Sequence, residues 1–164
     1  MNGDLRVYEI LKELSISFEY HEHPPAPTVK EASLYWKDIS ATHCKNLFFR
    51  NHKGDQHYLV IFEYSHNISI RELEQRLKQG KLSFASDQRM QKYLGLSPGS
   101  VSPFGLIHDH SRHVHVFLDE NLERSEKMSF HPNLNTASLV LGYPDFKRYL
   151  NWTSNRFEFI KLYD

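Results

Sequence analysis

The chain has 164 residues, of which 40% are hydrophobic and 24% charged, a balance typical of a globular protein rather than a disordered one. Twenty basic residues match twenty acidic ones, which excludes a general cationic coat for nucleic acid but leaves room for a local basic pocket. Because there is no long apolar run, no basic-then-apolar leader and only one cysteine, we expect a single cytoplasmic domain over residues 1–164, without disulfides or membrane contact.

The predicted elements alternate between helices and strands without a regular βαβ rhythm. In chain order they are a helix (4–14), a strand (17–21), a helix (28–36), two strands (43–50 and 56–63), two helices (69–77 and 86–94), three strands (114–118, 128–131 and 137–141), a helix (145–150) and a strand (157–162). Thr28 with Glu31 and Ser69 with Glu72 have the spacing of capping boxes. The predicted fold class is α+β, with a mixed, mainly antiparallel sheet and flanking helices.

Residues 43–50 are expected to form a strand with both faces covered. Lys45 shares one face with large apolar residues, so its burial would be costly without an anionic partner; the alternative is a lysine at a frayed strand end with its amine in water. Asn46 points the other way, where it either belongs to a site or fastens a neighbouring loop. Cys44 is expected to act as a small buried hydrophobic residue rather than as a nucleophile.

A glycine- and proline-rich loop spans residues 95–106. Glycine lets backbone approach a ligand closely, and proline fixes φ, so a stiff loop of this kind could build a small pocket from backbone groups. An ordinary turn connection is the alternative. The candidate residues of this loop are Gly99, Ser100, Val101, Ser102, Pro103, Phe104 and Gly105.

A second polar segment, residues 131–135, separates two predicted strands. His131 supplies an imidazole, and Asn133 and Asn135 supply amides, either as site groups or as parts of an Asx turn. The eleven histidines also include three His-x-His pairs. No HExxH or CxxC motif accompanies these pairs, so we expect solvent-exposed turn histidines and predict neither metal nor cofactor.

Three segments in this order resemble the YbaK/ProX family of aminoacyl-tRNA editing domains. They are Lys45-Asn-Leu-Phe-Phe-Arg50, Gly99-Ser-Val-Ser-Pro-Phe-Gly-Leu106 and Phe130-His-Pro-Asn-Leu-Asn-Thr136, and the similarity extends over nearly the whole chain, including Thr28-Val-Lys-Glu-Ala32. By this resemblance Lys45 corresponds to the family's pocket lysine, residues 99–103 to its GxxxP loop, and His131 to the histidine of its His-Pro-Asn turn.

The resemblance implies the fold of these domains and a trans-editing aminoacyl-tRNA hydrolase, most similar to members that remove alanine from proline tRNA. Lys45 would hold the 3′-terminal phosphate, and residues 99–103 would hold the ester and the ammonium group. The substrate-binding set is completed by Thr28, Asn46, Phe104, Gly105, Asn133 and Asn135.

The implied partners are the acceptor end of mischarged proline tRNA and prolyl-tRNA synthetase. The alternatives are a deacylase for Cys-tRNA(Pro) or a serine-charged tRNA, and a non-catalytic module that binds tRNA or a synthetase. Two positions depart from the family pattern: Ser138 replaces a frequent threonine, and Ser154-Asn155 replaces a Gly-His pair. The second departure leaves the role of that C-terminal turn open.

Overall fold

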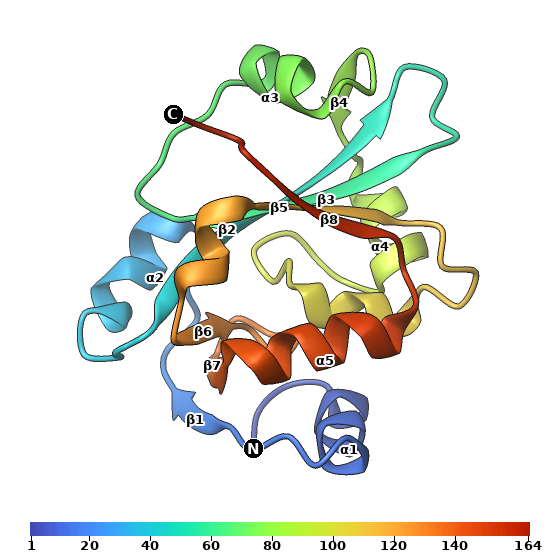
Figure 1. Ribbon diagram of the computed structural model, residues 1–164. Helices are drawn as coiled ribbons and strands as arrows, with labels where there is room; N and C mark the ends of the chain where they lie inside the picture. The colour runs from blue at the N-terminus through green and yellow to red at the C-terminus, as the bar shows by residue number, and fades with distance from the viewer.

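The architecture is arranged around one long strand, β2 (Thr42–Asn51), which takes part in both halves of the sheet (Figure 1). The computed structural model describes residues 1–164. The other strands are β1 (Glu19–Glu22), β3 (His57–Glu63), β4 (Leu82–Phe84), β5 (His115–Asp119), β6 (Lys127–Phe130), β7 (Ala137–Gly142) and β8 (Phe157–Ile160). Their order is β1-β7-β6-β2-β3-β5-β8, and β4 pairs with the end of β2.

The sheet is mixed, as expected from the sequence. Four neighbouring pairs are antiparallel, namely β1/β7, β2/β3, β2/β4 and β6/β7. Three are parallel, namely β2/β6, β3/β5 and β5/β8. The antiparallel pairs therefore predominate only narrowly.

Strands β2 and β3 are covered on both faces, which confirms the interpretation of residues 43–50. Phe48 and Ile61 belong to the main core of 25 buried residues, whereas Phe49 and Phe62 belong to a second cluster of nine on the opposite face. The first six residues of β3 are all buried. Since successive side chains of a strand alternate between faces, a strand buried on both sides reads as a nearly continuous apolar run, as β3 does.

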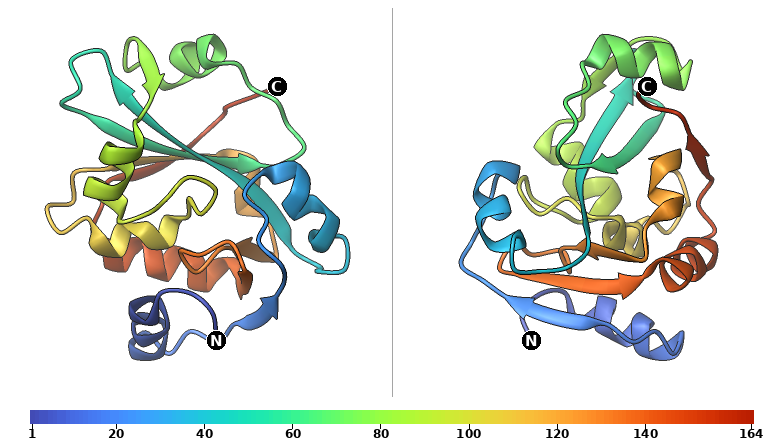
Figure 2. Two further views of the ribbon diagram at one scale, coloured as in Figure 1. Left: turned by 180° about the vertical axis from the view of Figure 1, so that it is seen from behind. Right: turned by 60° about the vertical axis from the view of Figure 1, so that its left-hand side comes forward.

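Five α-helices and two 3₁₀ segments surround the sheet. They are α1 (Leu5–Glu13), α2 (Val29–Trp36), α3 (Ile70–Leu77), α4 (Asp87–Leu94), η1 (Pro103–His108), η2 (Glu120–Arg124) and α5 (Tyr143–Thr153). The left view of Figure 2 shows α2 and α4 on the near side of β2, with the loop after α4 extending toward α2. No helix of this chain is both long enough and apolar enough to cross a bilayer.

The predicted helix starts are confirmed at their capping residues. Asp4, Thr28, Ser69 and Ser86 each accept a hydrogen bond from a first-turn amide. The reciprocal bond of a full capping box forms only at Ser69. β4, η1 and η2 were not predicted, because elements of three to six residues carry little periodicity. α5 also extends beyond the predicted helix at both ends.

Candidate active site

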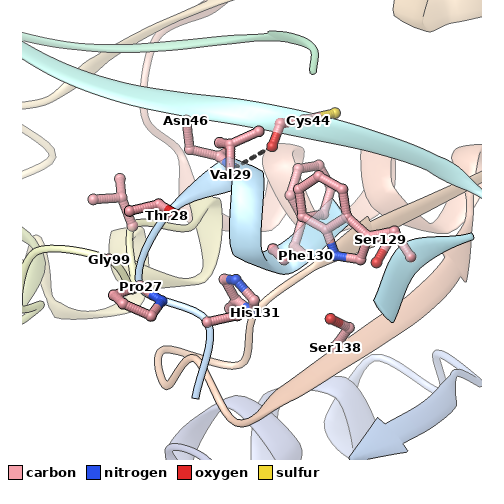
Figure 3. Close-up of a pocket in the computed structure, with 14 residues that line it drawn as sticks. Pro27, Thr28, Val29, Cys44, Asn46, Gly99, Ser129, Phe130, His131 and Ser138 are labelled. Atoms are coloured by element: carbon pink, nitrogen blue, oxygen red, sulfur yellow. Dashed lines mark hydrogen bonds between the residues drawn. The ribbon is translucent and has the colours of Figure 1, made fainter. Parts of the chain in front are cut away.

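A pocket of about 170 Å³ lies where α2, β2, the end of β6 and the loop before η1 meet (Figure 3). Its lining has no carboxylate, lysine or arginine, and half of it is hydrophobic. The lining residues are Ala26, Pro27, Thr28, Val29, Ala32, Trp36, Cys44, Asn46, Gly99, Val101, Ser129, Phe130, His131 and Ser138. A small, mostly apolar cavity with a few neutral polar groups suits a small side chain and can fix its orientation.

Helix α2 supplies one wall of the pocket. Val29, Ala32 and Trp36 recur at helical spacing and therefore share the inward face. Thr28 fixes the start of the helix by accepting a hydrogen bond from the Glu31 amide at 3.2 Å. Trp36 is held by stacking on His43, with ring centroids 4.6 Å apart. The wall is thus anchored at both ends, and the small Ala32 side chain between them leaves space for a ligand.

Asn46 brings an unused hydrogen-bond acceptor to the pocket. It shares a face of β2 with Cys44, and its Nδ2 donates only a long bond of 3.4 Å to the Cys44 carbonyl. Its Oδ1 is buried without a partner. A buried polar atom left unpaired costs about 1–3 kcal/mol, which a donor on a bound ligand would recover. The Asn46 side chain has no hydrogen bond to a neighbouring loop, so the loop-fastening alternative is wrong.

Gly99 brings backbone of the glycine- and proline-rich loop against the pocket. Its φ is +86°, and a Cβ at this position would lie 2.8 Å from the Pro27 carbonyl oxygen. Glycine is therefore required both by the left-handed conformation and by the close approach to the chain before α2. The amides of Gly99 and Val101 donate to no group of the chain. They are consequently free to donate to a ligand.

The other predicted residues of this loop lie behind the pocket, where they support it. Ser102, Phe104 and Gly105 are buried. The Ser102 hydroxyl caps η1 by accepting from the Phe104 amide at 3.1 Å. The Pro103 carbonyl accepts from the Tyr149 hydroxyl at 2.7 Å. Ser100, also buried, donates its amide to the Ser97 carbonyl at 3.1 Å.

His131 presents a neutral imidazole to the pocket. Its Nδ1 lies 2.8 Å from the Ala137 carbonyl, which can only accept, so Nδ1 carries the proton and Nε2 keeps a lone pair. Burial is the main cause of a lowered pKa for His131. The ring is therefore uncharged at neutral pH.

The two asparagines of the same turn do not line the pocket. Asn133 has a φ of +64° and donates to Asp4 Oδ2 at 3.2 Å and to the Phe104 carbonyl at 3.3 Å. The Asn135 carbonyl accepts from the Ala26 amide at 3.3 Å. Both residues connect the turn of His131 to neighbouring segments of the site.

Lys45 lies outside the pocket, in an adjoining groove. Its Nζ donates to the His66 carbonyl at 2.7 Å and to Asn67 Oδ1 at 2.8 Å, so one N–H remains for another acceptor. The groove and the pocket share Val29 and Asn46 in their linings. The sequence brought Lys45 and Asn46 together as neighbours, but the alternation of β2 places them on opposite faces.

Cys44, Ser129 and Ser138 line the pocket without having been predicted as site residues. Burial raises the pKa of the Cys44 thiol far above its ordinary value, so the group stays protonated and is a poor nucleophile. Ser138 Oγ lies 3.1 Å from His23 Nε2. The two serines are small polar residues inside apolar strands, and Ser138 also departs from the family pattern, but neither signal indicated a position in the pocket lining.

The expectation that the paired histidines are solvent-exposed is wrong for part of the set. His115 is buried and lies 2.9 Å from Glu158 Oε2. His108 Nε2 lies 2.6 Å from Asp4 Oδ2. These histidines are fixed by carboxylates of distant segments, a relation that local turn composition does not reveal.

The departure at Ser154-Asn155 lies away from the pocket. Ser154 ends α5 with a φ of +62°. Asn155 is buried, and its Nδ2 donates to Asp109 Oδ2 at 2.8 Å and to the Val114 carbonyl at 2.9 Å. This turn connects the start of β8 to the chain before β5 and does not contribute to the pocket lining.

Comparisons with known proteins agree on the kind of domain. The profile of the aminoacyl-tRNA editing domain family matches residues 23–149. The chain is 38% identical over 162 residues to the prolyl-tRNA editing protein ProX of Acetoanaerobium sticklandii, covering 99% of both chains. It is 30% identical to prolyl-tRNA synthetase associated domain-containing protein 1 of Xenopus laevis, covering 94% of this chain and 95% of the relative.

Solved structures share the fold. A crystal structure described as a candidate trans-editing enzyme for prolyl-tRNA synthetase superimposes with a TM-score of 0.69 at 20% identity, covering 96% of this chain and 95% of the other. A second crystal structure, of the hypothetical protein APE2540, gives a TM-score of 0.70 at 18% identity.

Replacing Gly99 tests whether its contact with Pro27 holds the pocket together. Gly99→Ala is expected to lower the free energy of unfolding by about 2–4 kcal/mol, because it adds a clash with backbone to the cost of a left-handed residue. Gly80 is the matched control: its φ is +82°, but a Cβ there meets nothing within 4 Å. Gly80→Ala should cost about 1 kcal/mol in the same urea titration. Equal losses in the two variants would contradict the importance of the contact.

Proposed function

We infer that this protein, which belongs to the YbaK/ProX family of aminoacyl-tRNA editing domains, hydrolyses mischarged proline tRNA in trans, with Ala-tRNA(Pro) as its substrate. The chain is an aminoacyl-tRNA deacylase of that family. One observation carries the choice of substrate: the pocket is small, uncharged and bounded by unpaired backbone amides and by the unpartnered Oδ1 of Asn46. We place the activity in the cytoplasm, with prolyl-tRNA synthetase as the source of the mischarged tRNA.

The amino acid is recognised by one polar group and by the size of the pocket. Asn46 Oδ1 accepts a hydrogen bond from the α-ammonium group of alanine. The methyl side chain packs between Val29, Ala32 and Phe130, which line the same cavity. A proline ring needs more room on this side and is rejected by steric overlap with α2. Rejection of the larger, correct amino acid is the selectivity that an editing site requires.

Hydrolysis needs little chemical power, because an aminoacyl ester is already activated. A water molecule adds its oxygen to the carbonyl carbon, and the bond from that carbon to the ribose oxygen then breaks. The free amides of Gly99 and Val101 donate to the oxyanion formed on the way. His131 Nε2 accepts the proton of the water or holds the ribose hydroxyl next to it, and the proton ends on the ribose oxygen.

The groove beside the pocket takes the end of the RNA. Lys45 uses its third N–H to contact the terminal phosphate, while the His66 carbonyl and Asn67 keep its ammonium group in place. Since Val29 and Asn46 belong to both linings, a nucleotide in the groove can carry its amino acid directly into the pocket.

A serine ester is the second candidate substrate. Ser129 and Ser138 line the pocket and offer hydroxyl groups to a serine side chain, whereas the methyl group of alanine cannot bond to either. The two substrates differ by a single hydroxyl, a difference that sites of this size discriminate only modestly unless they provide dedicated partners.

A deacylation panel tests the proposed function. Proline tRNA charged with alanine, serine, cysteine or proline is incubated with excess enzyme, and the loss of the ester is followed over time. We expect alanine to be released fastest, proline at least roughly a hundredfold more slowly, and EDTA to have no effect. Release of none of the four amino acids above the spontaneous rate would contradict the proposal, and faster release of serine would favour the second candidate.

The assignment of Lys45 is tested by Lys45→Ala and Lys45→Arg. The alanine variant should lose roughly tenfold to a hundredfold in kcat/KM for Ala-tRNA(Pro), because it loses a charge-assisted phosphate contact. The arginine variant should recover only part of the loss, since guanidinium differs from ammonium in reach and geometry. Lys12→Ala, at an exposed position of α1, is the control. A folded Lys45→Ala protein with normal kcat/KM would rule out the phosphate contact.

The role of His131 predicts a pH profile. Only the neutral ring can accept through Nε2, so the rate should fall as pH falls through the pKa of His131. Burial lowers that pKa, and the fall should therefore begin below pH 6.5, the ordinary value for histidine. His131→Asn should remove this step from the single-turnover profile, whereas His110→Asn, at an exposed site, should keep it. Identical profiles for the two variants would exclude the proton-accepting role.

A further inference from the structure

Two arginine side chains converge beside the β2–β3 turn without an anionic partner. A Cβ on Gly54 would lie 2.8 Å from Arg89 Nη2 and 3.2 Å from Arg50 Nη1, so both guanidinium groups lie over the same turn. None of the ten ion pairs of the chain includes either arginine. The nearby carboxylate of Asp55 is bonded to Asn51 Nδ2 at 2.7 Å. Two like charges held this close favour an anion between them.

The Arg89 side chain is fixed in this position. Its Nη1 donates to the Gly54 carbonyl at 2.8 Å and to His57 Nε2 at 3.0 Å, which uses both hydrogens of that nitrogen. Nε and Nη2 make no hydrogen bond within the chain and remain available. A guanidinium group that is already ordered loses little further freedom when it binds a planar or tetrahedral oxyanion.

His57 completes the arrangement as a neutral acceptor. The ring is buried between Phe48 and Tyr93, with centroid distances of 5.6 and 4.2 Å. Because Nε2 accepts from Arg89, Nδ1 must carry the proton, and it donates to His113 Nε2 at 2.8 Å. Burial, followed by the charges of His113, Arg89, Arg50 and Lys92, lowers the pKa of His57 to about 4. The ring therefore positions Arg89 without adding a charge of its own.

The location of this cluster relates it to the pocket. Arg50 lies four residues after Asn46 and on the same face of β2, which corresponds to about 13 Å along the strand. Arg89 lies in the first turn of α4, whose last turn leads into the loop that carries Gly99. Lys92 is an exposed residue of the same helix, about one turn after Arg89 and before the loop that carries Gly99. In the left view of Figure 2 this helix and its loop run from the β2–β3 hairpin toward α2.

We propose that Arg50 and Arg89, with Lys92 beside them, bind a backbone phosphate of the tRNA acceptor arm a few nucleotides away from the ester in the pocket. This inference rests on the proposed function, because it takes the occupant of the pocket to be the aminoacylated end of that RNA. Phosphodiester oxygens suit the site, since a guanidinium fork matches their geometry and the contact is independent of base sequence.

The test measures binding of an RNA hairpin without an attached amino acid, which reproduces the acceptor stem and its single-stranded CCA end. Arg50→Gln should raise the Kd roughly three- to tenfold at about 0.1 M salt and reduce the slope of log Kd against log salt by about one. Arg124→Gln, at an exposed residue of η2 without an ion pair, should change neither quantity. Thermal unfolding of each variant checks that the fold is retained.

The outcome is independent of hydrolysis, so failure of the deacylation panel and failure of this inference can be told apart. Equal Kd values and salt slopes for Arg50→Gln and Arg124→Gln would overturn it. Binding of inorganic phosphate to the same variants is measured in parallel. If Arg50→Gln loses phosphate binding but keeps its RNA affinity, the inference is also overturned, because the cluster then binds a small anion and not the RNA backbone. Arg89→Lys, which keeps the charge but loses the fork, should show an intermediate Kd with an unchanged salt slope.

Discussion

The two-residue period of β2 decides where each functional group of this protein can act. Cys44, Asn46, Phe48 and Arg50 share one face, and Lys45 lies on the other, so Asn46 lines both the pocket and the groove whereas Lys45 lines the groove alone. One edge of β2 is paired with β6 at residues 42–43 and with β4 at residues 49–51. The stretch between these pairings has no strand beside it on that edge, and Val29 of α2 lies there in both linings. A terminal nucleotide can therefore lie in the groove while its amino acid enters the pocket.

The uncharged lining fits the chemistry assigned to it. A buried carboxylate would bind the ammonium group strongly, and a buried lysine would bind the oxyanion strongly. Without substrate, however, the desolvation cost of either charge would have no opposite charge to offset it. Neutral dipoles avoid that cost: an amide oxygen, two free backbone N–H groups and an imidazole with a lowered pKa. Because the ester is already activated, positioned dipoles are sufficient, whereas a weaker electrophile would require a stronger nucleophile than any group in this cavity.

Local sequence signals were sufficient for much of the fold and for part of the pocket. Capping residues and strand alternation located the longer elements, because each depends on interactions within a few residues. The pocket also needs distant approaches, such as Gly99 on Pro27, which no local pattern contains. Ser129 and Ser138 come together through the register of β6 and β7. The position of Lys45 outside the pocket depends on which face of β2 is covered by α2, and local sequence does not show this. Motif resemblance supplied Lys45 and His131 but not their division between two cavities.

A net charge of zero is compatible with RNA binding when the groups that recognise the amino acid and the cations that bind the RNA lie in different places. Charge that contacts a phosphate remote from the ester stabilises bound substrate and transition state alike, so it adds affinity and not rate. In the proposed arrangement, Arg50, about 13 Å from Asn46 along β2, and Arg89 would hold the common part of every tRNA, while the pocket would discriminate among amino acids by size and by single hydrogen bonds. Convergence of Arg50 and Arg89 is unfavourable in the free protein, and an RNA phosphate would relieve it. Under this proposal, the repulsion between the two arginines beside the turn would favour the RNA-bound state without altering the selectivity of the pocket.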